Sequence, residues 1–234
     1  MSGSSHWAKI KHEKIAGDVV KGAKFDKLMR QIQFSAKEKG GDPHINVALE
    51  QLIQKAKSIG MRMDKVQLAI DKGLGKIAAP PMEARVYETF VNGVSFVIEA
   101  LTDSDQRTSQ QMRALLERHK ASLAPRNACL VNFQRVVSLH CSVPTEDDAL
   151  ALADKLGAID FRWSAEGTDL ILPPEAAYAS AIKGAYTAEF QWLPKFRVPV
   201  EPKVENGINT LIKELEERDD VQEISTNHES APAA

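Results

Sequence analysis

The sequence has few cysteines, no long apolar run and none of the common catalytic motifs. Its 234 residues include two cysteines, Cys129 and Cys141, without CxxC spacing, which argues against a disulfide scaffold or thiolate metal site and favours a reducing compartment. No window approaches the roughly eighteen uninterrupted apolar residues of a transmembrane helix. The HExxH, GxSxG and Walker patterns are missing. We therefore expect no membrane span, metal, cofactor or catalytic residue, and predict that the chain is not an enzyme.

The remaining acid–base residues are explained better by packing and solvation than by chemistry. The six histidines are scattered, and a lone histidine such as His119 or His140 is more often packed or on the surface than catalytic. The acidic pairs Asp147-Asp148 and Asp219-Asp220 stand beside predicted helices. Because adjacent residues on a helix point apart, we interpret both pairs as solvated helix ends.

The net charge of −2 conceals opposite charges in two parts of the chain. Residues 1–76 hold 15 Lys and Arg against 8 Asp and Glu, and residues 77–234 hold 15 against 24. Such polarity is typical of a basic module that meets phosphate and is joined to acidic domains that do not. The alternative is that the charge asymmetry only keeps the domains soluble.

Residues 1–78 are predicted to form an all-helical domain, because apolar residues recur at i, i+3, i+4 and i+7 spacing. The two clearest runs are Phe25, Leu28, Met29, Ile32 and Ala36, then Leu49, Leu52, Ile53 and Ala56. Gly40-Gly41-Asp42-Pro43 separates them. Asp64 is expected to cap a short third helix that ends at Gly73. Residues 73–81 are predicted to be a linker.

The pattern then changes to the period-two alternation of strands. Residues 85–91 and 94–102 flank Asn92-Gly93, a strong signal of a β-hairpin, and residues 108–111 resemble a capping box that opens a helix. From residue 130 the predicted order is strand, helix, strand, strand, helix, strand, at 136–141, 147–156, 159–163, 170–172, 174–183 and 187–193. This is the order of the ferredoxin-like split βαβ unit.

A last helix around residues 208–215 and a last strand at 221–226 cannot form a stable unit alone. We expect them to return to the hairpin and complete its domain. The predicted fold is therefore α+β with three domains: a basic helical domain at 1–78, a discontinuous α+β domain at 79–132 with 203–234, and an inserted ferredoxin-like α+β domain at 133–202. The tail from His228 to Ala234 is expected to be disordered.

The basic run near the N-terminus is the candidate binding surface. Between His6 and Arg30 three carboxylates stand against seven cations, which are Lys9, Lys11, Lys14, Lys21, Lys24, Lys27 and Arg30. Lysine suits sequence-independent contact with phosphate because it is a mobile point charge. The alternative interpretation is a solvated helix face.

Several blocks of the sequence resemble the YebC/PmpR proteins and their mitochondrial relatives, the translational activators of cytochrome c oxidase subunit I. Residues 3–12, GSSHWAKIKH, resemble the GHSKWANIKHRK opening of that family. The likeness continues at residues 21–28, 40–43, 99–103, 107–108 and 219–224. The resemblance implies a helical first domain followed by two α+β domains, without catalytic activity or cofactor.

The resemblance also implies a set of contact residues. His12 belongs to the basic opening, and Arg107 is what remains of an NRNRT motif, here Ser104-Asp105-Gln106-Arg107-Thr108. A loop at Trp192, Leu193 and Pro194 is expected to contact the ribosome, or Trp192 plugs the space between domains. Glu13 departs from the family, which has Arg at that position. Such drift suits a divergent mitochondrial member.

The function expected from the resemblance is a mitochondrial translation factor that associates with the ribosome, and with rRNA or mRNA, to support synthesis of respiratory-chain subunits, for example by relieving stalls. We expect a monomer in the mitochondrial matrix. Residues 1–5 have neither an apolar core nor an Arg-rich presequence. If the protein is imported into an organelle, we expect that the address has been removed or was never part of this sequence. The alternatives are a DNA-binding transcriptional regulator in a bacterial cytoplasm and a scaffold that binds only protein.

Overall fold

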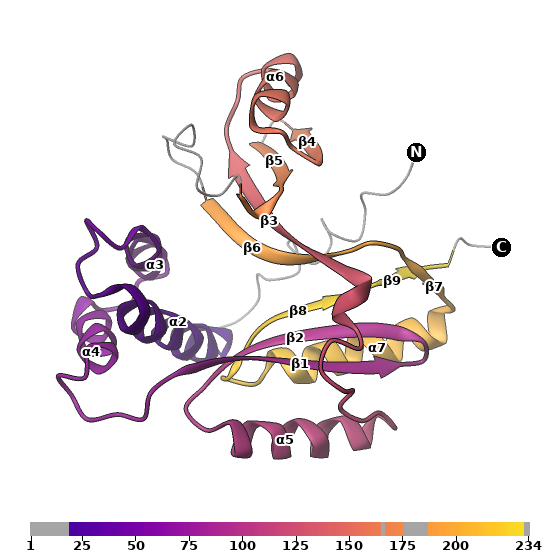
Figure 1. The fold of residues 1–234 in the computed structure, drawn as a ribbon, viewed down its shortest axis with the longest axis horizontal. Helices are drawn as coiled ribbons and strands as arrows, with labels where there is room; N and C mark the ends of the chain where they lie inside the picture. Colours follow the sequence, from indigo (N-terminus) through magenta and orange to yellow (C-terminus); the bar gives the residue numbers. More distant parts are fainter. Residues whose placement is uncertain (1–18, 165–166, 176–186, 232–234) are drawn as a thin grey trace. The chain divides into compact units, whose positions relative to one another are not determined.

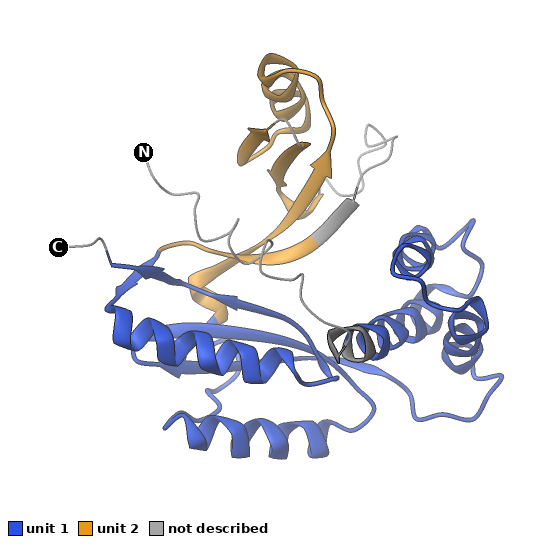
Figure 2. Cartoon of the chain, turned by 180° about the vertical axis from the view of Figure 1, so that it is seen from behind, with its two compact units in different colours: residues 1–129, 197–234 blue, residues 130–196 orange. Residues whose placement is uncertain are grey.

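The computed structural model describes residues 19–164, 167–175 and 187–231 (Figure 1). Its contacts divide the chain into two units: unit 1 comprises residues 1–129 and 197–234, and unit 2 comprises residues 130–196 (Figure 2). Both contain helices and strands, and residues 19–73 of unit 1 contain three helices. The predicted α+β class is confirmed, whereas the finer three-domain boundaries stay a prediction. No helix of the described ranges is long and apolar enough to span a membrane.

Three helices form what we call the helical region, residues 24–78. They are α2 (Val19–Lys39), α3 (Val47–Ser58) and α4 (Met63–Gly73). The apolar stripe predicted on α2 packs in a common core with those of α3 and α4, where Ile32, Leu49 and Ala56 have no exposed surface. Asn46 joins two of the helices: its side chain accepts the Leu49 N–H at the start of α3 and donates to the carbonyl of Gly40 after α2.

The third helix differs from the prediction at its start. The cap of α4 is Arg62, and Asp64 lies in the first turn, where its carboxylate pairs with Arg62 at 2.7 Å and accepts the Lys65 N–H. At the other end, a Cβ atom on Gly73 would stand 2.3 Å from the carbonyl oxygen of Gln33. Glycine is therefore required for α4 to approach α2 closely.

A three-stranded antiparallel sheet, in the order β1-β2-β8, lies in the rest of unit 1, residues 79–129 and 197–231, which we call the sheet region. Its strands are β1 (Glu83–Val91), β2 (Val94–Thr102) and β8 (Val221–Thr226). Asn92 and Gly93 both have positive φ, at 52° and 82°, as a two-residue hairpin turn requires. Helices α5 (Asp105–Arg118) and α7 (Pro202–Glu216) pack their apolar stripes on one face of this sheet.

Two details of this sheet region correct the sequence analysis. Helix α5 begins at Asp105, and its cap is Ser104 rather than Thr108. The segment after β8 is ordered through residue 231, because β9 (His228–Ser230) pairs in parallel with β7 (Val198–Val200). His228 is fully buried there. The expectation of a disordered tail from His228 is therefore wrong for residues 228–231, and residues 232–234 lie outside the described part.

Unit 2 contains a four-stranded antiparallel sheet in the order β4-β5-β3-β6. The strands are β3 (Phe133–Cys141), β4 (Asp160–Ser164), β5 (Gly167–Leu172) and β6 (Thr187–Pro194), and α6 (Glu146–Leu156) joins β3 to β4. A short 3-10 helix, η1 (Leu130–Asn132), leads into β3. This strand order is that of the ferredoxin-like unit. The helix predicted at 174–183 falls almost wholly outside the described residues.

Candidate nucleic-acid interface

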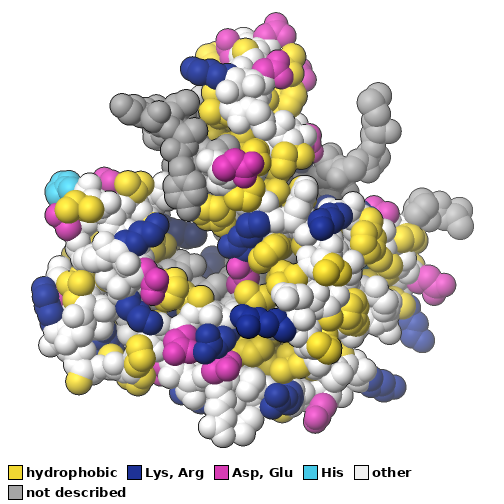
Figure 3. Space-filling view, viewed as in Figure 1, with side chains coloured by type: hydrophobic (Ala, Val, Ile, Leu, Met, Phe, Trp, Pro, Cys, Tyr) yellow, Lys and Arg dark blue, Asp and Glu magenta, His cyan; other side chains and the backbone are white. Residues whose placement is uncertain are grey.

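Cations outnumber carboxylates in the helical region. Residues 24–78 contain eleven Lys and Arg against six Asp and Glu, and eight of the eleven cationic side chains are exposed. Figure 3 shows one face of the molecule, on which Lys and Arg lie among apolar and acidic side chains. A surface with this surplus attracts polyanions, because each phosphate that it neutralises releases a bound counterion.

The first half of the predicted basic run lies beyond the described part of the chain. Lys9, Lys11, His12 and Lys14 precede residue 19, and Lys21 belongs to α2 but its side chain is not among those described. Lys24 is the first predicted contact residue whose side chain the structure places, and it is exposed near the start of α2. Contact of these six residues with nucleic acid stays a prediction.

Lys27 and Arg30 contact the sheet region of the same unit. The Lys27 Nζ donates to the carbonyl of Glu216 at 2.6 Å, at the C-terminal end of α7, where a cation satisfies a carbonyl left over by the helix. The Arg30 Nη1 donates to the carbonyl of Leu101 at 3.4 Å and lies 3.9 Å from the Met82 sulfur. These two side chains tie α2 to the sheet region, so their contacts include structural ones that the sequence analysis did not foresee.

Arg107 lies in the first turn of α5 and pairs with Asp103, with about half of its side chain exposed. Partial burial alone would raise the pKa of the Asp103 carboxyl, but the hydrogen bond and charge of Arg107 hold that pKa below its ordinary value. The exposed half of Arg107 is accessible to a ligand. Its guanidinium is at the same time the partner of a neighbouring carboxylate.

Beside this pair, three blocks that carry the family resemblance meet in a buried network. The Thr108 hydroxyl donates to Asp220 and lies 2.8 Å from the Thr102 hydroxyl, which in turn accepts the Ser104 N–H. Arg218 donates to both carboxylate oxygens of Asp220 at 3.0 and 2.8 Å. The network joins the end of β2, the start of α5 and the segment before β8.

The network corrects the interpretation of Asp219-Asp220 as a solvated helix end, since Asp220 is only 5% exposed. Burial raises the pKa of Asp220, but the Arg218 and Thr108 hydrogen bonds outweigh burial and leave that pKa below its ordinary value. Sequence reasoning did not single out Arg218. Its proximity in the chain to Asp220 was the available signal, but Thr108 is 112 residues away.

The predicted ribosome-contact loop is not a loop. Trp192, Leu193 and Pro194 belong to β6 and pair with residues of β3. The Trp192 ring lies 4.8 Å from the guanidinium carbon of Arg135, its partner across the sheet, which is a cation–π distance. All three residues are half-buried. The prediction of an exposed tip is therefore wrong, and ribosome contact by these residues stays a prediction.

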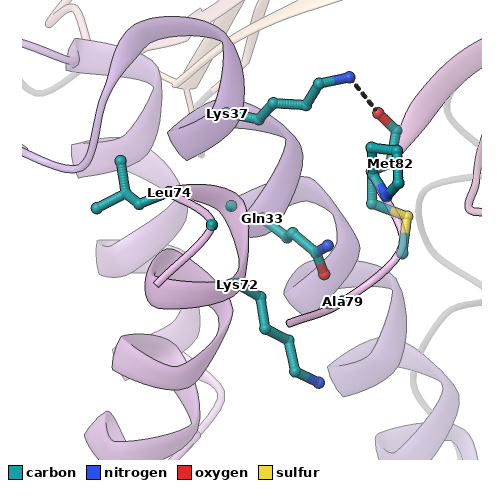
Figure 4. A pocket seen from close by; sticks show the side chains of 9 residues that line it. Gln33, Lys37, Lys72, Leu74, Ala79 and Met82 are labelled. Carbon is teal, nitrogen blue, oxygen red and sulfur yellow. Dashed lines mark hydrogen bonds between the residues drawn. The ribbon is translucent and has the colours of Figure 1, made fainter. Parts of the chain in front are cut away.

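The two cysteines and the possible metal ligands are the remaining residues with reactive side chains. Cys129 and Cys141 are both buried and free, and burial raises the pKa of the Cys129 thiol to about 11. Within the described ranges no three His, Cys, Asp or Glu residues are grouped as a metal site would need. The structure does bring together one set of residues that the sequence analysis missed: Gln33, Lys37 and Lys72 line a cavity in unit 1 (Figure 4).

Fold and charge together define the class of protein: a chain of mixed α+β architecture in which a cation-rich helical region precedes the β-sheets. Its fold is similar to the crystal structure of a conserved hypothetical protein from Aquifex aeolicus. The TM-score is 0.84, the sequence identity is 28%, and 98% of each chain is covered.

Family comparisons identify the chain more closely. Residues 5–76 match the model of the TACO1/YebC protein N-terminal domain, and residues 82–228 match the TACO1/YebC second and third domain. The chain therefore belongs to the TACO1/YebC family.

Similar proteins from two bacteria carry the name probable transcriptional regulatory protein. The relative from Kosmotoga olearia is 35% identical, with 98% of this chain and 94% of the relative covered. The relative from Thermoanaerobacter pseudethanolicus is also 35% identical, with 98% and 97% covered. Because these relatives are bacterial, the finer prediction of a mitochondrial activator stays a prediction.

Proposed function

We propose that the protein is a regulator of gene expression that binds nucleic acid through the cations of its helical region. The observation that carries the proposal is the excess of positive charge in residues 24–78, which hold eleven cations and six carboxylates. Most of the eleven cations are exposed. The names of the bacterial relatives support a regulatory role in transcription. DNA is therefore the first partner to test.

The chemistry expected at this surface is phosphate contact by lysine. Nine of the eleven cations are lysines, which neutralise phosphate as point charges without imposing a geometry. Affinity should then fall steeply with salt, with a slope of about −0.9 for each phosphate neutralised on duplex DNA.

The test compares two triple variants with the same change in net charge. Lys39, Lys57 and Lys65 are exposed and come one from each helix of the helical region, whereas Lys120, Lys203 and Lys213 are exposed elsewhere in unit 1. K39E/K57E/K65E should weaken binding to duplex DNA by about tenfold or more and flatten its salt dependence. K120E/K203E/K213E should change both much less. Equal losses would contradict the assignment to the helical region.

The same binding experiment decides whether the protein is a sequence-specific transcription factor. A specific site should be bound roughly 10³-fold or more tightly than random duplex DNA at the same salt. An equal affinity for all duplexes would contradict sequence-specific transcriptional regulation and would make RNA the next partner to test.

A second candidate is a ribosome-associated translation factor, and one observation favours it. Base reading in the major groove depends heavily on arginine that can bind guanine in a bidentate manner. In residues 24–78 the two arginines have other contacts: Arg30 with Leu101 and Met82, and Arg62 with Asp64. The remaining lysines suit a structured RNA recognised by its backbone. The lysines support ribosomal RNA as the partner, and the resemblance to mitochondrial activators supports the mitochondrial ribosome and a location in the matrix.

Ribosome co-sedimentation tests this second candidate. Wild-type protein should sediment with ribosomes at moderate salt, and K39E/K57E/K65E should remain in the supernatant. Crosslinking followed by sequencing of the bound nucleic acid separates the candidates, because rRNA, mRNA and DNA give different sequences. A yield dominated by DNA fragments would contradict the translation role.

A further inference from the structure

A cavity of about 290 Å³ lies where α2, the C-terminal end of α4 and residues 79–82 meet (Figure 4). Two lysines and one glutamine supply its polar side chains, and the rest of its wall is glycine, alanine, leucine, proline and methionine. Its lining contains no carboxylate. The volume is close to the lower end of the ~300–1,000 Å³ typical of sites for small molecules, which combine apolar walls with a few polar groups.

Contacts within unit 1 hold the walls of the cavity in place. The backbones of Gly73 and Gln33 are in close contact, so that no larger residue fits at position 73. The Gln33 Nε2 donates to the carbonyl of Pro80 at 3.3 Å, and the Lys37 Nζ donates to the carbonyl of Met82 at 2.9 Å. These bonds fasten residues 80–82 to α2. The cavity is thus preformed, which lowers the entropic cost of binding a ligand.

The two lysines make the cavity positive. Lys37 extends from α2 along one side and Lys72 from α4 along the other (Figure 4). The nearest carboxylate in sequence to Lys72 is Asp71, which pairs with Lys76 at 3.4 Å and accepts the Gln67 amide at 3.1 Å. Those contacts direct the Asp71 charge to other partners.

The end of helix α4 would oppose an anion if its carbonyls were open, since the C-terminus is the negative end of a helix. The carbonyls of Ile70, Asp71 and Lys72 instead accept the N–H groups of Leu74, Lys76 and Gly75, at 2.9, 2.9 and 3.2 Å. The turn that closes the helix therefore uses these oxygens. The lysines determine the sign of the potential inside the cavity.

We propose that this cavity binds one nucleotide unit, with its phosphate at Lys72 and its base against Ala79, Pro81 and Met82. A base that is paired and stacked in a duplex cannot enter, whereas a base in a single strand or in a free nucleotide can. For the single strand the inference deepens the proposed function, because it specifies the form of nucleic acid that the helical region prefers. A free nucleotide is the other source of the same chemistry.

The experiment uses the full chain and two matched pairs of variants. Lys72→Gln removes a charge inside the cavity, and Lys213→Gln removes one at an exposed position of α7, outside the proposed binding surface. Ala79→Leu fills the cavity without changing charge, and Ala78→Leu adds the same bulk at an exposed neighbour that does not line it. Binding is measured to a short single strand and to the duplex of the same sequence, by fluorescence anisotropy, and to AMP, UMP and inorganic phosphate, by calorimetry.

We expect wild-type protein to prefer the single strand, and Lys72→Gln and Ala79→Leu each to reduce that affinity by about tenfold, the value of one well-held base. Lys213→Gln and Ala78→Leu should leave the preference for the single strand intact, and duplex affinity should change little with Ala79→Leu. A single-strand preference that survives both cavity variants would overturn the proposal. Because Lys72→Gln removes no packed side chain, it tests the cavity even if Ala79→Leu fails to fold.

The outcomes also separate this inference from the proposed function. If wild-type protein binds strand and duplex equally and no cavity variant distinguishes them, the cavity proposal fails while nucleic-acid binding stands. If it binds AMP or UMP in a Lys72-dependent manner but no strand or duplex, the cavity is a nucleotide site and the proposed function fails. Binding of inorganic phosphate as tight as that of AMP and UMP would remove the base from the proposal and overturn it.

Discussion

The helical region and the sheet region of unit 1 use charged side chains in different ways. In the helical region, most of the cations are exposed and outnumber carboxylates. In the sheet region, Asp220 and Glu88 are 5% and 3% exposed, and hydrogen bonds surround both. Charge that can reach solvent is available for recognition, whereas a buried charge must be paired and then serves the fold. Lys27 and Arg30 stand where the two regions meet.

The largest effect should follow from breaking the Asp220 network. Asp220→Ala removes an acceptor of the Thr108 hydroxyl and leaves the half-buried Arg218 guanidinium with only its hydrogen bond to Gln111. It should lower the free energy of unfolding by about 3 kcal/mol. Urea denaturation measures the loss. Asp219→Ala, at the exposed neighbour, is the control and should cost little. Equal losses would mean that the network does not stabilise the sheet region.

A smaller loss is expected at Glu88, whose two carboxylate oxygens accept the N–H groups of Asn127 and Cys129 at 2.6 Å each. Glu88→Gln turns one acceptor into a donor facing an N–H group, and should cost about 2 kcal/mol of unfolding free energy. Glu117→Gln changes the same chemistry at an exposed site of α5 and should have almost no effect. Urea denaturation of the two variants in parallel gives the comparison.

Acid should weaken the sheet region through Asp220 and Asp103. Both carboxyls have pKa values below the ordinary one in the folded chain. Their contribution is therefore complete above the unfolded-state pKa of about 3.9 and is lost as the pH falls through the lower folded-state values. The free energy of unfolding should decline below about pH 4, and less so in Asp220→Asn. An identical acid profile in wild type and variant would contradict the pairing.

The smallest effect on stability should come from the exposed lysines. K39E/K57E/K65E changes three side chains without buried contacts in the described structure, so its unfolding free energy should stay within about 0.5 kcal/mol of wild type per site. The affinity of the same variant for duplex DNA should fall by about tenfold or more. Destabilisation as large as that of Asp220→Ala would remove the distinction between the two regions.

Local sequence patterns predicted the elements whose determinants lie close together in the chain. Asn92-Gly93 specifies its turn because both residues tolerate positive φ, and the strand at 221–226 was predicted with the observed bounds. The predictions were wrong where a residue distant in the chain determines the local structure. His228 is ordered because β9 pairs with β7, about thirty residues earlier. Helix α5 begins three residues before Thr108 and is capped by Ser104, and the Thr108 hydroxyl bonds Asp220 instead.

The candidate site was likewise predicted only in part from the sequence. Charge counts located the basic region, since net charge depends only on composition. They could not show that Lys27 reaches the carbonyl of Glu216, or that Trp192 is held in a strand beside Arg135. Nor could they reveal the cavity between Lys37 and Lys72, because its walls come from three separate segments.

The helix and strand pattern, the α+β class and the polarity of charge follow from residue spacing and composition, which can be read over a few residues at a time. Which charged groups stay accessible to a ligand depends on how distant segments pack. A sequence does not show whether a given charged residue is surrounded by solvent or paired with a residue from a distant segment. Burial and pairing, which arise when these segments pack, make Asp220 part of the fold and leave Lys72 at the wall of a cavity.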